Sequence, residues 1–315
     1  MSLGVIFPGQ GSQSVGMLAD LYEHHAVVRQ TFEEAGTVLG YDLAQLCLQG
    51  PEEDLNRTDR TQPALLAAGV AVWRLWREQG GPSPAMMAGH SLGEYTALTC
   101  AGALDFSDAV SLVARRGEFM QAAVPAGTGA MAAILGLEDE AIAEICKQAA
   151  DGEVVEPVNF NAPGQVVIAG QREAVERAMK AASEAGAKRA LPLPVSVPSH
   201  CSLMVPAARR LADVLNETDI KIPDIPVVHN VDAATRSDAG EIRDALVRQL
   251  HNPVRWVQTV QAMRGAGVSA FIEAGPARVL AGLGKRIDKA APVKCVMDND
   301  SLEAGLVFAK EQENA

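Results

Sequence analysis

Short apolar runs alternate with longer segments of helical periodicity through the first part of the chain. The runs at residues 3–7 and 85–88 predict two strands, and the clearest helical pattern lies between them at 63–79. Further helices are predicted from the second strand through Cys100 and over 107–122. Short apolar strands that alternate with helices are typical of the parallel sheet of an α/β fold.

The same alternation returns in the last third of the chain. Strands are predicted at residues 227–228 and 270–272, and helices over 241–250 and 254–264. This part is therefore predicted to continue the α/β arrangement of the first part.

The order of the elements changes between these two parts. Residues 130–191 predict a strand, a helix, two strands, a helix and a strand, which is the order of the ferredoxin-like fold. A proline-rich segment, 192–198, then leads back out. We therefore predict a discontinuous main domain of residues 1–125 and 196–315, with an inserted ferredoxin-like subdomain of residues 126–195.

The composition is that of an ordinary globular protein. Hydrophobic residues make up 48% of the 315 and charged residues 21%, so the chain can bury a substantial core. The net charge is 27 − 39 = −12 and aromatic residues are only 4%, which argues against nucleic-acid and membrane partners. The longest near-apolar run, 64–73, is too short to span a bilayer. The five cysteines form no C-x-x-C pair, and we expect reduced thiols in a cytoplasmic protein.

One serine lies between small residues at a predicted strand-to-helix turn, in Gly89-His90-Ser91-Leu92-Gly93. The spacing G-x-S-x-G is that of a nucleophile elbow, a turn so tight that a side chain at either glycine would collide with backbone. Such a corner exposes the hydroxyl of Ser91 beside the free N–H groups at the start of a helix. Those donors can stabilise an oxyanion.

A serine becomes nucleophilic only when a base removes its proton. His200 is the best candidate, because the proline-rich segment before it would fix it on a loop over the main sheet. The other histidines are His24, His25, His90, His229 and His251, and a structural role is the ordinary alternative for all six. Cys201 is a less favoured nucleophile. No acid–histidine cluster is evident, so we expect no metal.

Hydrolases with this corner carry a carboxylate between the serine and the histidine in sequence. Asp105, Asp108 and Glu118 lie in that interval, but in helical segments where charged side chains are expected to face solvent. The residues alone do not identify the group that orients the histidine. A backbone or side-chain carbonyl could serve as well as a carboxylate.

The loop Gly9-Gln10-Gly11 follows the first predicted strand. Residue 14 is serine, so the loop lacks the third glycine of a dinucleotide-binding turn, and no nucleotide cofactor is expected. Its glycines would bring the backbone close to Ser91, with Gln10 supplying a donor. The alternative is a turn that merely needs glycine.

Arg115 and Arg116 are paired on the predicted helix 107–122. Paired arginines on a helix are more often solvated than buried. An arginine buried beside Ser91 would instead offer a bidentate partner for a substrate carboxylate.

These motifs together resemble those of the malonyl-CoA:acyl carrier protein transacylases of bacterial type II fatty acid synthesis. The matching segments run in order over essentially the whole chain: 7–13, 89–95, 116–117, 159–165, 198–200, the surroundings of Gln249, and 273–276. The resemblance implies an α/β-hydrolase-like main domain with a parallel sheet and an inserted ferredoxin-like small domain. The active site would lie in the cleft between them.

The resemblance also implies roles for the site residues. Ser91 would be the nucleophile and His200 its base, oriented by the backbone carbonyl of Gln249. The backbone N–H groups of Gln10 and Leu92 would form the oxyanion hole. The implied reaction is ping-pong transfer of a malonyl group from malonyl-CoA to the phosphopantetheine thiol of acyl carrier protein, without a cofactor.

Substrate and partner contacts follow from the same resemblance. Arg116 would bind the malonyl carboxylate. The carrier protein of this pathway is acidic, so we expect a basic docking patch on an enzyme that acts as a monomer. The first choice for this patch is Lys285, Arg286 and Lys289, and the second is Lys188-Arg189, with a merely solvated surface as the alternative.

Two other classes of protein remain open at this stage. A thioesterase or esterase uses the same serine corner, but the absence of an evident acid and the presence of Arg116 weigh against it. A non-catalytic scaffold that only binds carrier protein would not need both Ser91 and His200.

Overall fold

The computed structural model describes residues 2–125, 127–195 and 197–314. Its larger domain is built on a five-stranded sheet with the spatial order β7-β2-β1-β8-β9, in which all neighbouring strands are parallel. The strands are β1 (Ser2–Phe7), β2 (Met86–Gly89), β7 (Val227–Val228), β8 (Val268–Ala274) and β9 (Val293–Val296). The predicted parallel α/β sheet is confirmed.

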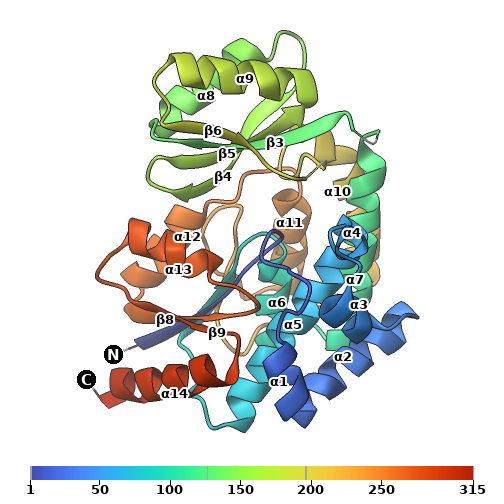
Figure 1. The fold of residues 1–315 in the computed structure, drawn as a ribbon, viewed down its shortest axis with the longest axis vertical. Coiled ribbons are helices and arrows are strands. Elements are labelled where there is room, and N and C mark those ends of the chain that lie inside the picture. The colour runs from blue at the N-terminus through green and yellow to red at the C-terminus, as the bar shows by residue number, and fades with distance from the viewer. Residues whose placement is uncertain (1, 126, 196, 315) are drawn as a thin grey trace.

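Helices cover both faces of this sheet (Figure 1). Alternate side chains of β1 enter different cores: Val5 and Phe7 join the cluster that contains the central helix, whereas Ile6 joins a second cluster on the other face. The first face packs against α2 (Ala26–Leu39), α5 (Thr58–Glu78), α6 (Gly93–Cys100), α7 (Phe106–Ala123), α10 (Val205–Glu217) and α11 (Ala239–Gln249). The second face packs against α12 (Trp256–Gly265) and α13 (Val279–Ile287).

Shorter or peripheral helices complete this domain. They are α1 (Ala19–His24), α3 (Leu43–Gln49), α4 (Glu52–Leu55), the 3-10 turn η1 (Ser202–Met204) and α14 (Asn299–Asn314). In the part of the chain that the structure describes, no helix combines the length and the apolar character needed to cross a bilayer.

The smaller domain lies above the larger one in Figure 1. Its four strands form an antiparallel sheet with the order β4-β5-β3-β6. Its elements are β3 (Gly129–Leu135), α8 (Asp139–Ala149), β4 (Val155–Ala162), β5 (Gln165–Gln171), α9 (Arg172–Glu184) and β6 (Arg189–Pro192). This β-α-β-β-α-β order confirms the predicted ferredoxin-like arrangement.

The small sheet turns one face toward its own helices and the other toward the larger domain. Met131, Val158 and Val167 pack on that second face together with Cys201 of the larger domain. The edge of β4 is also tied down by backbone hydrogen bonds, since Phe160 N donates to Val254 O and Val254 N donates to Val158 O. These contacts fix the inserted domain to the larger one at Cys201 and Val254.

Some elements depart from the sequence predictions. The central helix begins at Thr58 rather than at residue 63, because its first turn is held by the Thr61 hydroxyl, which donates to Leu55 O and Arg57 O. The helices α10, α13 and α14 and the strand β9 were not predicted. The predicted domain limits fall at residues 126 and 196, which lie outside the described residues, so these limits stay a prediction.

Candidate active site

Ser91 occupies a sharp corner between β2 and α6. Its φ of 53° lies in the left-handed region that residues with side chains rarely adopt. A Cβ on Gly89 would lie 1.8 Å from the backbone of Gly93, and a Cβ on Gly93 would lie 2.1 Å from Phe7 O. Both positions therefore require glycine, as the elbow pattern predicts.

His200 lies on the loop by which the chain returns from the inserted domain. Its Nε2 lies 2.7 Å from Ser91 Oγ, although the two residues are 109 positions apart. The backbone of His200 has a φ of 67°, and its N–H donates to Leu250 O at 3.1 Å. The structure thus brings together the predicted nucleophile and base.

The other ring nitrogen of His200 faces a carbonyl. Nδ1 lies 2.7 Å from the backbone oxygen of Gln249. A carbonyl oxygen can only accept, so Nδ1 carries the proton and Nε2 is free to accept the serine proton. Burial of the ring, followed by the nearby Arg116 charge, lowers the pKa of His200 to about 3. The imidazole is neutral at physiological pH.

Arg116 is 1% exposed and contacts amide groups rather than carboxylates. One guanidinium nitrogen donates to Gln62 Oε1 at 2.7 Å and another to Gln249 Oε1 at 3.1 Å. Its Nε has no partner among the described residues, and the guanidinium lies 5.2 Å from the centre of the Tyr95 ring. Burial lowers the pKa of Arg116, yet an arginine in a protein stays charged. The site therefore holds a buried positive charge without an acidic neighbour in contact.

A cavity of about 260 Å³ opens between the two domains around these residues. Ser91, Arg116 and His200 line its floor, and Met131 and Leu193 of the small domain line its wall. The cavity is lined by residues of both domains, where the resemblance implies the active site.

The glycine-rich loop after β1 approaches the serine corner. A Cβ on Gly9 would lie 2.4 Å from His90 O, so glycine permits this close approach. Gln10 and Leu92 line the cavity, and within the described part of the chain neither of their N–H groups donates a backbone hydrogen bond. Both residues thus line the same cavity as Ser91, and an oxyanion hole formed by their N–H groups stays a prediction.

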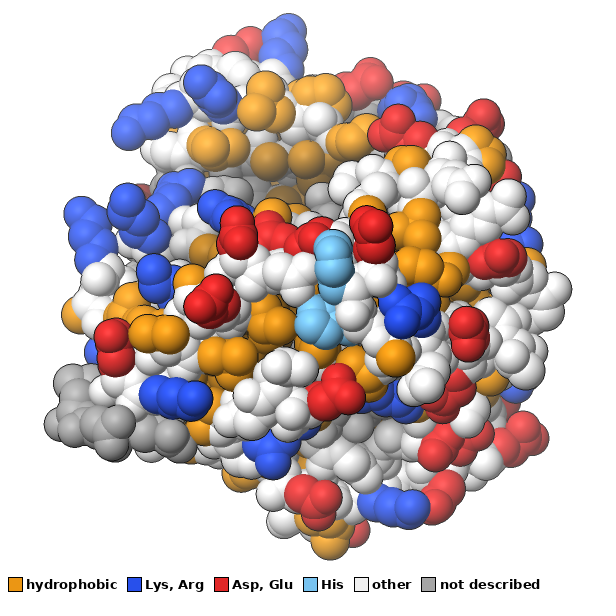
Figure 2. All heavy atoms as spheres, turned by 60° about the horizontal axis from the view of Figure 1, so that its bottom comes forward, with side chains coloured by type: hydrophobic (Ala, Val, Ile, Leu, Met, Phe, Trp, Pro, Cys, Tyr) orange, Lys and Arg blue, Asp and Glu red, His pale blue; other side chains and the backbone are white. Residues whose placement is uncertain are grey.

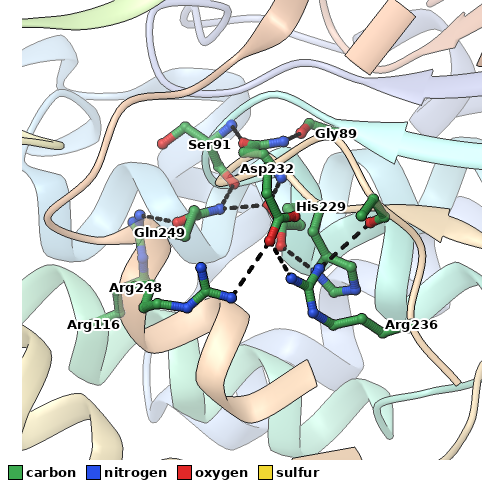
Figure 3. Close-up of polar contacts among 11 residues, drawn as sticks. Gly89, Ser91, Arg116, His229, Asp232, Arg236, Arg248 and Gln249 are labelled. Atoms are coloured by element: carbon green, nitrogen blue, oxygen red, sulfur yellow. Dashed lines mark hydrogen bonds and ion pairs between the residues drawn. The ribbon is translucent and has the colours of Figure 1, made fainter. Parts of the chain in front are cut away.

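Three buried polar residues behind the corner were not among the predicted site residues: Glu94, His229 and Asn230. Glu94 accepts hydrogen bonds from His229 Nδ1 at 2.7 Å and from Asn230 N at 2.9 Å. Figure 3 shows Gln249 between Ser91 and Arg116, with His229 on the far side of the corner. Glu94 lies in the first turn of α6 and is the one charged residue of that helix, which was the one signal in the sequence.

The other candidates have structural surroundings. His90 Nε2 contacts Asn161 Oδ1 at 2.7 Å, and the side chain of His24 is 57% exposed. The Cys201 thiol donates to Pro198 O, and burial raises its pKa to about 12, so it is no thiolate nucleophile. No group of three or more possible metal ligands occurs in residues 2–125, 127–195 and 197–314. Asp105 caps α7 through Ser107 N.

The two predicted basic patches approach each other at the domain junction. Lys188, Arg189 and Arg286 line one surface groove. Arg286 also donates to Pro163 O at 3.1 Å and to Gln165, so it ties α13 to the turn between β4 and β5. In Figure 2, Lys and Arg side chains gather at the left, above and below the recess between the domains.

Comparisons with known proteins agree with this geometry. The family of acyl transferase domains matches residues 5–297. The chain is 59% identical over 301 residues to the malonyl CoA-acyl carrier protein transacylase of Escherichia coli (strain K12), covering 96% of this chain and 97% of that protein. Its identity to the Bacillus subtilis (strain 168) transacylase is 44% over 313 residues, covering 99% and 98%.

Solved structures show the same likeness over the full fold. An acyl carrier protein S-malonyltransferase from Vibrio cholerae superposes with a TM-score of 0.94 at 62% identity, covering 96% of this chain and 99% of that one. A malonyl-transacylase in complex with its type II PKS acyl-carrier protein superposes with a TM-score of 0.97 at 58% identity, covering 98% and 100%.

Proposed function

The chain belongs to the malonyl CoA-acyl carrier protein transacylases, a family of acyl transferases, and from this premise we propose how its residues perform the transfer. The reaction moves a malonyl group from malonyl-CoA to acyl carrier protein for fatty acid synthesis. The route runs through a malonyl ester on Ser91.

The first half-reaction forms the ester. His200 Nε2 accepts the proton of Ser91 Oγ, 2.7 Å away, while Oγ attacks the thioester carbonyl. The N–H groups of Gln10 and Leu92 bind the oxyanion, each donor lowering the barrier by about 3 kcal/mol. The tetrahedral intermediate collapses, the proton passes from His200 to the departing coenzyme A sulfur, and malonyl-Ser91 remains.

The second half-reaction runs in the opposite direction, with the carrier-protein thiol in place of the coenzyme A thiol. His200 takes the proton of the phosphopantetheine thiol, and the sulfur attacks the ester carbonyl. Ser91 Oγ leaves and regains its proton from His200. A hydrogen bond from Nδ1 to Gln249 O holds the ring in place through both steps.

Arg116 selects the acyl group. Its guanidinium is buried, donates to the side-chain oxygens of Gln62 and Gln249 and lies near the Tyr95 ring. Among the described residues no carboxylate pairs with it, so a malonyl carboxylate supplies the missing counter-charge. An acetyl group would leave that charge buried and unpaired, which disfavours its transfer. This buried, uncompensated arginine beside the Ser91–His200 pair is the observation that carries the assignment.

The acidic carrier protein docks on the basic residues at the domain junction. Lys285, Arg286 and Lys289 are exposed on or just after α13, and Lys188 and Arg189 are exposed at the start of β6. Arg286 of the first patch lines a groove together with Lys188 and Arg189, which supports a docking surface that includes residues of both patches. All catalytic groups come from one chain, which supports a monomer as the active unit.

Acyl transfer in two stages tests this function. The enzyme is mixed with malonyl-CoA, the acyl group is located by mass spectrometry, and carrier protein is then added. We expect malonate on Ser91 that disappears as malonyl-carrier protein forms, and a panel of acyl-CoAs should show preference for acyl groups with a carboxylate. Rapid release of free malonate without carrier protein would instead indicate a hydrolase.

A further inference from the structure

Asn230 spans the serine corner from behind. Its Oδ1 accepts the N–H of Ser91 at 2.7 Å, and its Nδ2 donates to Gly89 O at 2.7 Å. The side chain is fully buried, so these bonds have no competition from water. One amide therefore joins both ends of the turn that forces Ser91 into the left-handed region.

This contact also decides which N–H groups face the cavity. Since Ser91 N–H is already engaged by Asn230, it is unavailable to an oxyanion. The next N–H, that of Leu92, has no hydrogen-bond partner in the described part of the chain. Asn230 thus fixes both the direction of the hydroxyl and the position of the helix end that offers the donor.

Glu94 in turn holds Asn230 and Gln249. Its Oε2 accepts from Asn230 N at 2.9 Å and from Gln249 Nε2 at 3.1 Å, while Oε1 accepts from His229 Nδ1. Carboxylate and backbone carbonyl oxygens accept hydrogen bonds. Gln249 therefore points its NH₂ group at Glu94 and at the backbone oxygen of Ser91, 2.8 Å away, which leaves its Oε1 facing Arg116. The reversed amide would set one donor against another.

We propose that Glu94 and Asn230 are positioning residues that align the serine corner with the carboxylate-binding arginine without touching the substrate. Asn230 acts on Ser91, and Glu94 acts on Arg116 through Gln249. Glu94 is thus the buried acid of this site. It contacts the side chain of Gln249, whose backbone oxygen orients His200. The inference rests on the proposed malonyl transfer.

The loop that carries Asn230 supplies a matched control. Asp232, two residues on, is 36% exposed and binds Arg236 and, at 3.5 Å, Arg248. Figure 3 draws the ion pairs that join Asp232 to Arg236 and Arg248. Asp232→Asn perturbs the same loop without touching the corner, so it reports the effect of loosening the loop alone.

The experiment compares wild type, Asn230→Ala, Glu94→Ala, Glu94→Gln and Asp232→Asn. It measures single-turnover acylation of Ser91 by malonyl-CoA and by acetyl-CoA, and sulfonylation of Ser91 by phenylmethanesulfonyl fluoride, a neutral reagent that needs no arginine. Rates are expressed per folded molecule, measured by circular dichroism.

Asn230→Ala should slow all three reactions of Ser91 on the order of 10- to 100-fold, the range known for partners that support metal ligands. The malonyl-CoA concentration that gives half-maximal acylation should stay unchanged. Glu94→Ala should reduce the malonyl-to-acetyl rate ratio by about 10-fold, Glu94→Gln should do so less, and Asp232→Asn should match wild type.

Two results would overturn the inference. One is an Asn230→Ala enzyme that reacts at wild-type rates per folded molecule. The other is a malonyl-to-acetyl ratio that stays at the wild-type value in Glu94→Ala, or in Glu94→Gln if the alanine variant does not fold. A wild-type enzyme that forms no malonyl-Ser91 would instead refute the proposed function itself.

Discussion

The backbone oxygen of Gln249 lies 2.7 Å from Nδ1 of His200, in the place where many serine enzymes put a carboxylate. A carbonyl fixes the tautomer and the orientation of the ring as a carboxylate does. It carries no negative charge, however, so it does little to favour the imidazolium. With the ring buried beside a guanidinium, His200 is a base that stays neutral far below the usual histidine range.

Acylation should therefore be insensitive to mild acid. Because the pKa of His200 is about 3 rather than 6.5, the imidazole stays unprotonated as the pH falls through 6. Rapid-quench measurements of malonyl-Ser91 formation between pH 5 and 7 should give a nearly constant rate. A half-maximal rate near pH 6.5 would contradict this prediction.

The same lowered pKa means that His200 makes the stability of the folded protein sensitive to acid. Below pH 6.5 the unfolded chain binds a proton at this histidine and the folded protein does not, so stability is lost progressively as the pH falls toward 3. At pH 5 the loss reaches about 2 kcal/mol relative to pH 7 or above. Denaturant unfolding of wild type and His200→Gln at both pH values should show a smaller loss in the variant.

Replacing Arg116 should change which acyl group is transferred. Arg116→Ala removes the partner of the malonyl carboxylate, and malonyl transfer should fall on the order of 100-fold or more while acetyl transfer improves. Arg115→Ala is the matched control, because Arg115 is exposed on the same helix. Steady-state transfer from malonyl-CoA and acetyl-CoA measures both effects. Unchanged malonyl transfer by Arg116→Ala would show that Arg116 does not bind the malonyl carboxylate.

The elbow glycine should tolerate no side chain. Gly93→Ala places a Cβ 2.1 Å from Phe7 O, so the backbone of β1 or α6 must move, and stability should fall by about 3 kcal/mol or more. Gly282→Ala in α13 is the control, because a Cβ there meets nothing within 4 Å and alanine favours a helix. Thermal unfolding compares the two variants, and equal melting temperatures would contradict the collision.

Charge reversal on the basic surface should weaken carrier-protein binding alone. Lys285→Glu should raise the KM for carrier protein several-fold and leave the KM for malonyl-CoA unchanged, with the difference shrinking at high salt. Arg286→Glu is a less selective probe because Arg286 also binds the turn at Pro163. Lys147→Glu on α8 serves as a control, because Lys147 is exposed on a different helix. Equal effects on both KM values would place docking elsewhere.

The parts of the site that lie close together in sequence were predictable from it. The spacing of glycines around Ser91 identifies the corner, since a Cβ at Gly89 or Gly93 would collide with backbone. His200 could be favoured but not assigned, because its contact with Ser91 spans 109 residues. The role of Gln249 came from family resemblance, as a backbone carbonyl has no signature in side-chain patterns.

Glu94 shows why the remaining contacts were missed. An acid in the first turn of a helix is ordinarily explained by the helix dipole and by solvent. Its partners His229 and Gln249 lie 135 and 155 residues away, so only the tertiary structure reveals that the carboxylate is buried and shared. Strand β9 was missed for a related reason, since its four residues include Lys294 and Cys295 and are ordered by pairing with β8.

The insertion of a whole domain between Ser91 and His200 has a consequence for synthesis of the protein. The serine corner is built from β1, β2 and α6, all complete by residue 100, whereas His200 arrives only after the small domain has returned the chain. Gln249 and Asn230 follow later still. A nascent or truncated chain therefore presents a serine without a base, and the capacity to react appears as the last long-range contacts close. Reactivity at Ser91 is thus a readout of completed folding.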